Sequence, residues 1–266
     1  VGYIGSHTCV ELVHAGFDVV VVDNYSNSKP EAIKRVERLV NRTIKVYQSD
    51  VTDRDALRSI FEQEGDIVAV IHFAGLKAVG ESWDIPLHYY HVNVTGSIAV
   101  AEVMAEYGVE PLVFSSSATV YGDPASVPIQ EHFSTKAENP YGRSKLMVEE
   151  ILQDYCKVAG SRMKVALLRY FNPVGAHESG TIGEDPSGIP NNLMPFVSQV
   201  AVGKLPRLRI FGDDYDTPDG TGVRDYIHVV DLARGHVHAI RTLLTNDADC
   251  FVWNLGKGRR RSLRNM

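Results

Sequence analysis

The sequence has few cysteines, no excess of positive charge and no long apolar run. Its three cysteines, Cys9, Cys156 and Cys250, lack the spacing of a metal site or of a disulfide framework. We therefore expect reduced thiols, no bound metal and a cytoplasmic protein. Lys and Arg number 27 against 33 Asp and Glu, for a formal net charge of -6, and form no basic stripe. With no apolar run of membrane-spanning length, we expect neither nucleic acid nor membrane as a partner.

Helical and strand-like patterns alternate along the first two thirds of the chain. Strands are predicted at residues 17–22, 43–48, 67–73, 112–115 and 163–169, and helices at residues 6–15, 30–40, 53–64, 85–107 and from about residue 140. The alternation favours a parallel sheet and therefore an α/β fold of the doubly wound type. With 44% apolar and 23% charged residues, the 266-residue chain can form one large or two modest domains.

Two glycines precede the first predicted helix. Gly2 and Gly5 resemble the second and third glycines of a dinucleotide-binding fingerprint, in which the helix N-terminus receives a pyrophosphate. Asp23 ends the next predicted strand, where such proteins hydrogen-bond the adenosine ribose hydroxyls. Glycine turns and strand-end carboxylates also occur in α/β proteins without a nucleotide, so both interpretations stay open.

Other candidate ligand-binding residues also follow predicted strands. In parallel sheets, ligands bind beyond the carboxyl ends of the strands, where Asp50, Val51 and the serines at residues 115–117 are expected. The loop at residues 73–77 joins this group. Its small residues would let a cofactor approach the backbone, and Lys77 could reach a phosphate or a ribose. The alternative is that this loop is only a tight turn from strand to helix.

Tyr141 and Lys145 lie four residues apart in a predicted helix that begins near Asn139 and Pro140, where proline suits the first turn. Tyrosine is a poor base because its reference pKa is roughly 10. A nearby ammonium would favour the phenolate, and a shift to about pH 7 needs about three units, or roughly 4 kcal/mol, which one ammonium aided by a cationic cofactor ring could supply. The alternative is that Tyr141 is a packed ring and Lys145 a solvated amine, without a catalytic role.

The character of the sequence changes after residue 172. Residues 175–195 are rich in glycine, proline and polar residues, and such long irregular stretches are usually functional. We place the start of a smaller substrate domain here, with residues 1–172 as the nucleotide-binding domain and 173–266 as the substrate domain. A strand is predicted at residues 207–211. The acidic turn at 213–220 does not match a calcium loop, and His228, His236 and His238 lack zinc-helix spacing.

Several longer motifs, taken together, are specific to one family. They are HFAGLKAVGES at 72–82, SSSATVYG at 115–122, LRYFNPVGA at 168–176, IPNNLM at 189–194 and VRDYIH at 223–228. With Ser117, Tyr141 and Lys145, they make residues 2–256 resemble the UDP-galactose 4-epimerase family of the extended short-chain dehydrogenase/reductase superfamily. The resemblance implies a Rossmann-type fold, NAD as cofactor, and UDP-galactose and UDP-glucose as substrates.

The resemblance also assigns roles to individual residues. Tyr141 would be the active-site base, Lys145 would bind the nicotinamide ribose and tune Tyr141, and Ser117 would bond the sugar 4-oxygen. Cofactor contacts are implied for Gly2, Tyr3, Ile4, Gly5, Asp23, Asn24, Tyr25, Ser26, Asn27, Ser28, Asp50, Val51, Phe73, Ala74, Gly75, Lys77, Ser115, Tyr141, Lys145 and Phe171. Substrate contacts are implied for Lys77, Ser117, Tyr141, Asn172, Asn192, Leu193, Phe211 and Arg224, the last with a guanidinium suited to a diphosphate.

The sequence departs from the family pattern at three places. The first strand and first glycine are not present before Val1, Val92 stands where some relatives carry Asn, and residues 257–266 fit poorly. We therefore expect a chain cut at both ends. A homodimer is expected through a four-helix contact of residues 85–107 and 139–159, with Leu146 and Ile151 as apolar candidates.

Two other functions compete with epimerisation. A nucleotide-sugar 4,6-dehydratase would carry an Asp-Glu pair where this chain has Ala118 and Thr119. A non-catalytic NAD-binding scaffold would have no need to keep Ser117, Tyr141 and Lys145 together. Both are less favoured than epimerisation at the sugar 4-position, with rotation of a 4-keto intermediate and return of the hydride.

Overall fold

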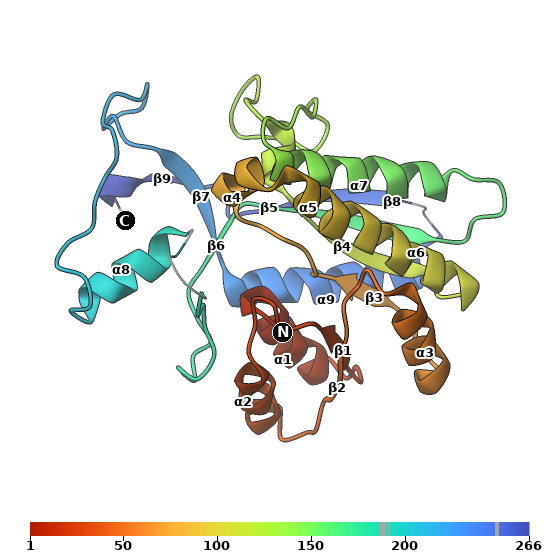
Figure 1. The fold of residues 1–266 in the computed structure, drawn as a ribbon. Coiled ribbons are helices and arrows are strands. Elements are labelled where there is room, and N and C mark those ends of the chain that lie inside the picture. Colours follow the sequence, from red (N-terminus) through yellow and green to blue (C-terminus); the bar gives the residue numbers. More distant parts are fainter. Residues whose placement is uncertain (187–189, 191, 248–249, 266) are drawn as a thin grey trace.

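The computed structural model describes residues 1–186, 190, 192–247 and 250–265 (Figure 1). Four parallel strands form its largest sheet, in the order β3-β4-β5-β8: β3 (Val70–His72), β4 (Pro111–Ser117), β5 (Lys164–Tyr170) and β8 (Cys250–Leu255). Two further strands, β1 (Val20–Asp23) and β2 (Lys45–Gln48), pair in parallel with each other. The predicted α/β fold with a parallel sheet is confirmed.

Helices cover both faces of the four-stranded sheet, as a doubly wound fold requires. On one face lie α3 (Arg54–Glu64), α6 (Gly96–Glu106) and α7 (Pro140–Cys156), whose apolar side chains pack on Phe114 and Leu167. On the other face, α9 (Val229–Thr245) packs on Val113 and Leu168, with α1 (Tyr3–His14) beside it (Figure 1). The strands are apolar on both sides because both sides are covered. A third apolar cluster joins α1 and α2 (Pro30–Val40) to β1.

The helix predicted at residues 85–107 is present but interrupted. It consists of α5 (Pro86–Tyr90), a π-helical turn η1 (His91–Thr95) and α6, and is preceded by the short α4 (Val79–Asp84). One turn of π-helix inserts an extra residue and changes which side chains face the sheet, and such turns are frequent at functional sites. Within the part of the chain that the structure describes, no helix is long and apolar enough to cross a bilayer.

A smaller sheet lies to one side of the main one. Its order is β6-β7-β9, with β6 (Asn172–Val174) parallel to β7 (Val223–His228), and β7 antiparallel to β9 (Arg260–Ser262). The remaining helices are η2 (Ala118–Tyr121), α8 (Leu193–Ala201) and η3 (Leu263–Asn265).

The strand predicted at residues 207–211 is wrong. These residues are described but adopt no strand, and Leu208, Ile210 and Phe211 are all exposed. Their apolar alternation has no neighbouring strand to pair with and no core to face, so the pattern alone does not produce a strand.

Two elements from the last third of the chain pack with the four-stranded sheet. β8 pairs with β5 along six registered residue pairs, and α9 packs on β4 and β5. Both elements follow residue 173, so strand pairing groups them with the first 172 residues rather than with the smaller sheet. The division into two domains at residue 173 therefore stays a prediction. β8 and α9 follow residue 173 in the sequence but pack with the first 172 residues.

Candidate functional site

Tyr141 and Lys145 are positioned by the start of α7. The predicted start is confirmed: Asn139 caps the helix through its Oδ1, which accepts from the Gly142 N–H at 2.8 Å, and Pro140 occupies the first turn. The two side chains therefore follow one another by one helical turn on the face toward β4. The convergence of the phenol and the ammonium on one spot stays a prediction.

The end of β4 supplies partners for both side chains. The Lys145 ammonium donates to the Ser115 carbonyl oxygen at 2.8 Å and lies 4.8 Å from the centre of the Phe114 ring. Ser117 is hydrogen-bonded to Tyr141 and also accepts from the Thr119 hydroxyl at 2.9 Å. The structure thus brings together Ser115, Ser117, Tyr141 and Lys145, as the sequence predicts.

Burial is the largest influence on the pKa values of both side chains in the protein alone. Burial raises the pKa of Tyr141, and the hydrogen bond from Ser117 only partly opposes that rise. Burial also lowers the pKa of Lys145 to about 8, against the opposing charge of Glu149. The lowering of the Tyr141 pKa by Lys145, aided by a cationic cofactor ring, stays a prediction, because burial is the larger effect in the protein alone. The protein by itself holds a neutral phenol beside an easily deprotonated lysine.

Asn93 is a site residue that the sequence analysis missed. It lies in the π-helical turn, only 2% exposed, and its Oδ1 accepts from the Leu76 N–H at 2.7 Å. Its Nδ2 donates to the Leu76 carbonyl at 3.0 Å and to the Ser144 hydroxyl at 2.9 Å. One carboxamide therefore fastens the loop after β3 to α7. An Asn in a helical run gives no such signal, because the π-turn that aims it inward is invisible in the periodicity.

Gly75 is required where this loop passes the site. Its φ of +154° is unfavourable for residues with a side chain, and an added Cβ would lie 2.9 Å from Asn93 Oδ1 and 3.6 Å from Lys145 Nζ. The loop with Phe73, Ala74 and Lys77 thus runs directly past Lys145. This close approach suits a cofactor-binding loop, and that assignment stays a prediction beside the alternative of a tight turn.

The N-terminus of α1 has the form of a phosphate site. Gly2 is its N-cap and no side chain caps it, so the first N–H groups of a 12-residue helix are open to a ligand. A Cβ at Gly2 would meet no atom within 4 Å, and at Gly5 it would meet only Phe73, at 3.8 Å. Tyr3 and Ile4 occupy the first turn, and the Tyr3 hydroxyl donates to the Gly175 carbonyl at 2.6 Å. These residues fit a dinucleotide pyrophosphate.

Asp23 ends β1 and orders the loop that follows it. Its Oδ1 accepts from the Tyr25 N–H and from the Ser28 hydroxyl, both at 2.8 Å. Tyr25 has a φ of 57°, so the chain turns sharply there. Exposed Asn24, Ser26 and Asn27 complete the loop. A carboxylate held at a strand end in this way suits the ribose hydroxyls of an adenosine.

Asp50 and Val51 continue this edge of the sheet. Asp50 accepts from Asn24 Nδ2 at 2.7 Å and from the Thr52 N–H and hydroxyl at 2.9 and 2.6 Å. Although burial acts to raise it, these hydrogen bonds hold the pKa of Asp50 below its ordinary value. Val51 packs so closely on α6 that a Cβ at Gly96 would lie 2.9 Å from it. The edge therefore presents an ionised carboxylate and an apolar side chain side by side.

A cavity of about 180 Å³ lies beside the smaller sheet. Four of the predicted substrate residues line it, namely Asn172, Asn192, Leu193 and Arg224. Arg224 is exposed and donates to the Val223 carbonyl at 2.8 Å, which leaves other N–H groups of its guanidinium for a ligand. The cavity combines one guanidinium with two carboxamides, a lining suited to a nucleoside diphosphate.

Four predicted substrate residues lie outside this cavity lining: Ser117 and Tyr141 at the end of β4 and the start of α7, and also Lys77 and Phe211. Phe211 is 81% exposed, and its role stays a prediction. Lys77 is half-exposed, with its ammonium 3.9 Å from Glu184, whose carboxylate also accepts from Asn192 Nδ2 at 2.6 Å. Asn192 is the N-cap of α8 without a capping hydrogen bond, and the neighbouring Asn191 lies outside the described residues. Phe171 lies between the two sheets and donates its N–H to the Leu255 carbonyl at 3.1 Å.

The buried histidines His236 and His72 lie against structural partners. His236 is buried, with Nδ1 2.8 Å from the Leu232 carbonyl and Nε2 against the Tyr170 hydroxyl, and burial lowers its pKa to about 4. Nε2 of His72 lies 3.0 Å from the Ser97 hydroxyl. Among the described residues, no group of three or more His, Cys, Asp or Glu side chains is arranged to hold a metal ion.

Comparison with known proteins agrees with this geometry. Residues 1–256 match the NAD dependent epimerase/dehydratase family. The UDP-glucose 4-epimerase of Bacillus subtilis is 60% identical over 257 residues, which cover 97% of this chain and 75% of that protein. The human UDP-glucose 4-epimerase is 54% identical over 264 residues, with the same shares of the two chains.

Solved structures show that the similarity also holds for the backbone fold. A crystal structure of UDP-glucose 4-epimerase from Bifidobacterium longum with NAD+ and UDP has a TM-score of 0.94 and 52% identity, covering 99% of this chain and 78% of that one. The enzyme from Stenotrophomonas maltophila, with NAD and a formylated UDP-arabinopyranose, has a TM-score of 0.95 and 49% identity, with the same coverage. The chain therefore belongs to the NAD dependent epimerase/dehydratase family.

Proposed function

We propose that this chain interconverts UDP-galactose and UDP-glucose with NAD as its cofactor. The observation that carries the proposal is the cluster of Ser117, Tyr141 and Lys145 at the end of β4, beside the loop that Asn93 fastens. Its relatives of 54–60% identity are UDP-glucose 4-epimerases. The dehydratase alternative lacks its acid and base, since Ala118 and Thr119 follow Ser117 and the Thr119 hydroxyl is bonded to Ser117.

Each residue of the cluster has a distinct task in the proposed reaction. Tyr141 takes the proton of the sugar 4-hydroxyl, and Ser117, which lies within hydrogen-bond distance of Tyr141, bonds the same sugar oxygen. Lys145 supplies the positive charge that favours the phenolate. Bound NAD supplies the hydride acceptor that oxidises the sugar at C4 and later reduces it again. The epimerisation therefore consumes no net oxidant.

Inversion at C4 requires the 4-keto sugar to turn while its nucleotide stays in place. Arg224 and Asn192 line a cavity suited to the nucleotide, whereas Ser117 and Ala118 are small side chains at the end of β4. The sugar is therefore held more loosely than the UDP. Rotation of the hexose then presents its other face to the returning hydride.

Substrate deuterated at C4 tests this mechanism directly. We expect the label to remain at C4 of the product, with UDP-galactose and UDP-glucose interconverting and no NADH accumulating. Mass spectrometry and NMR of the product measure the label, and absorbance at 340 nm measures NADH. Loss of deuterium to solvent would reject hydride return and favour proton abstraction at carbon.

Asp23 is expected to select NAD over NADP. In this role its carboxylate accepts from two ribose hydroxyls and repels a 2′-phosphate. In Asp23→Ala, we expect the NADP-to-NAD affinity ratio to rise by at least about tenfold, since a close charge repulsion is worth more than about 1.4 kcal/mol. Titration of apoprotein with both cofactors measures the ratio, with Asp18→Ala, an exposed acid before β1, as control. An unchanged ratio contradicts the assignment.

A cytoplasmic homodimer formed through α7 and the α5–α6 helix is also part of the proposal. Ile151, Met147 and Tyr155 are exposed apolar residues on α7, whereas Leu146 is partly buried. Tyr107, at the end of α6, is exposed as well. An apolar face of this kind on adjacent helices suits a self-complementary contact.

Charge placed on that face is expected to separate the protomers. Sedimentation of the intact protein at micromolar concentration should give a dimer, and Ile151→Glu a monomer, because a buried unpaired carboxylate costs several kcal/mol. Val202→Glu, which replaces an exposed apolar residue after α8, should remain dimeric. A monomeric wild type would reject the homodimer.

A further inference from the structure

The face of α7 that carries Tyr141 and Lys145 has a third polar residue one helical turn later. Tyr141, Lys145 and Glu149 are spaced by four residues each, so they follow one another along one face of the helix. The first two belong to the candidate site. Glu149 is completely buried, which is rare for a glutamate and requires charged or polar partners.

Arg169 on β5 is the charged partner of Glu149. Its side chain is 5% exposed, and its Nη2 donates to Glu149 Oε2 at 2.6 Å while Nε donates to Oε1 at 3.0 Å. A bidentate pair of this kind fixes both distance and orientation. A buried ion pair is weak support for stability, because an apolar pair of similar volume is often as stable. We therefore expect the ion pair to matter for the relative position of α7 and β5 rather than for stability.

Three consecutive serines of β4, residues 115–117, each bond to a different residue of the α7 face. The first accepts from the Lys145 ammonium through its carbonyl oxygen, at 2.8 Å. The second donates its hydroxyl to the Glu149 carboxylate, and the third is bonded to Tyr141. The strand and helix are thus aligned by three polar contacts in a row. Glu149 makes the one contact that lies away from the reacting groups.

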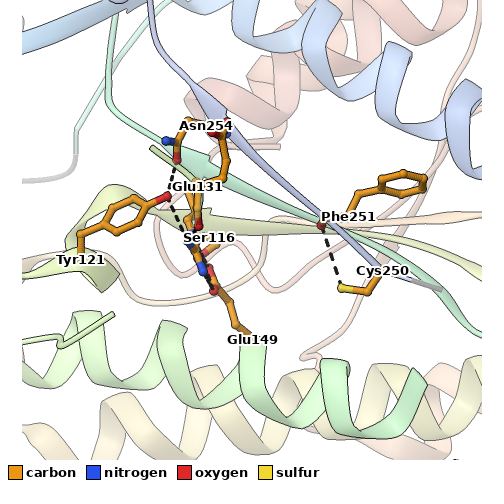
Figure 2. A network of polar contacts seen from close by, with 8 residues as sticks. Ser116, Tyr121, Glu131, Glu149, Cys250, Phe251 and Asn254 are labelled. Atoms are coloured by element: carbon orange, nitrogen blue, oxygen red, sulfur yellow. Dashed lines mark hydrogen bonds and ion pairs between the residues drawn. The ribbon is translucent and has the colours of Figure 1, made fainter. Parts of the chain in front are cut away.

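The ion pair also joins more distant segments to this alignment. Arg169 Nη1 donates to the Tyr121 hydroxyl at 2.9 Å and to the Glu131 carbonyl at 3.2 Å. Tyr121 in turn donates to Asn254 Oδ1 on β8 at 2.7 Å (Figure 2). The network therefore ties β4, β5 and β8 and the loop before α7 to one carboxylate on the catalytic helix.

We propose that Glu149 is a positioning residue for the reaction: paired with Arg169 and Ser116, it sets the alignment of α7 on β4 and so places Tyr141 and Lys145 against Ser117. This inference rests on the proposed function, and it assigns a task to a residue that touches neither sugar nor cofactor. A shift of about 1 Å in a reacting group can cost about 100-fold in rate. Alignment of the helix is therefore sufficient to control turnover.

The charge of Glu149 has a second effect on Lys145. Burial lowers the pKa of Lys145 to about 8, and Glu149 acts against that fall. The other titratable groups that face Lys145 are Tyr141 on the same helix and His72 on β3. Burial and Lys145 lower the pKa of His72 to about 3, so it is neutral near pH 7. Glu149 is therefore the anion that holds the pKa of Lys145 above the value that burial alone would give.

Three variants of the full chain loaded with NAD test the proposal. In Glu149→Gln we expect kcat to fall about 10- to 100-fold with the KM for UDP-galactose within about threefold. We also expect the alkaline limb of the kcat profile to move down by about one pH unit. Glu149→Asp, which keeps the charge, should restore that limb while kcat stays lowered. Glu150→Gln, at the exposed neighbouring position, should match the wild type.

A paired variant covers the case in which Glu149→Gln does not fold. Glu149→Gln with Arg169→Met removes both buried charges together, so no charge is left unpaired. We expect it to fold and still lose at least about fivefold in kcat, because the helix has lost its alignment. Full turnover with an unchanged pH profile in this folded variant overturns the proposal and leaves the pair a purely structural role.

Binding of NADH separates this inference from the proposed function. Its fluorescence titration needs no turnover, and we expect at least about fivefold weaker NADH binding in the paired variant, with the binding falling off at lower pH than in the wild type. A wild type that binds NADH but does not convert UDP-galactose would reject the proposed function alone. Wild-type NADH affinity and pH dependence in the paired variant would reject the positioning role.

Discussion

Tyr141→Phe is expected to lower kcat for UDP-galactose by about 10²- to 10⁴-fold, the usual contribution of general acid–base catalysis. The ring still fills its place beside Ser117, but the oxygen that would accept the sugar proton is gone. NAD content should remain near that of the wild type, because the ring fills the same volume. Steady-state kinetics and the cofactor content of the purified protein measure the two effects.

Tyr155→Phe is the matched control for this variant. Tyr155 lies on the same helix but is exposed, so loss of its hydroxyl should leave kcat unchanged. Substantial epimerisation by Tyr141→Phe would place the proton acceptor elsewhere. Ser117, its hydrogen-bond partner, would then be the first residue to test.

Lys145→Met is expected to change stability and activity in opposite directions. Lys145 is buried, and burial lowers its pKa to about 8 from the ordinary 10.5. Below pH 8 the folded protein must therefore hold a charge at a cost of about 3 kcal/mol, which methionine does not incur. The variant should unfold at a higher denaturant concentration at pH 7, while kcat falls by at least about 100-fold because the phenolate loses its cation.

The pH dependence of folding stability tests separately whether the buried charge of Lys145 causes the difference. Between about pH 8 and 10.5 the unfolded chain binds the Lys145 proton and the folded protein does not, so wild-type stability rises with pH in this window. The stability advantage of Lys145→Met should shrink over the same window. Urea unfolding at pH 7 and pH 10 measures it, with Lys157→Met at an exposed position as control. An advantage that stays constant with pH would assign the gain to packing alone.

Local signals predicted the catalytic helix well. The cap by Asn139, the proline after it and the four-residue spacing of Tyr141 and Lys145 are all contained within seven residues of sequence. The strands before the site were predicted for a similar reason, since short apolar runs bounded by polar residues need no distant partner to be recognised. Structural features that depend only on neighbouring residues can therefore be predicted from the sequence.

Features that depend on distant partners were not predictable. Glu149 in a helical run is typical of a solvated surface, and only the approach of Arg169 on β5 makes it a buried ion. The π-turn that aims Asn93 inward leaves no trace in a helical period. The apolar alternation at residues 207–211 has no pairing strand, so the same kind of pattern that succeeded elsewhere failed there.

The packing of α1 on α9 has a consequence for biosynthesis. Arg234 on α9 donates to Glu11 on α1 at 3.1 Å, across 223 positions of the chain, and both helices share an apolar cluster with β4 and β5. At about 5–20 residues per second, a ribosome needs on the order of 10 to 50 s to make the intervening chain. The face of Val113 and Leu168 is complete when β5 ends at Tyr170, and it lacks α9 for roughly the last third of that time. We therefore expect chaperones to bind this face of the nascent chain until α9 has emerged.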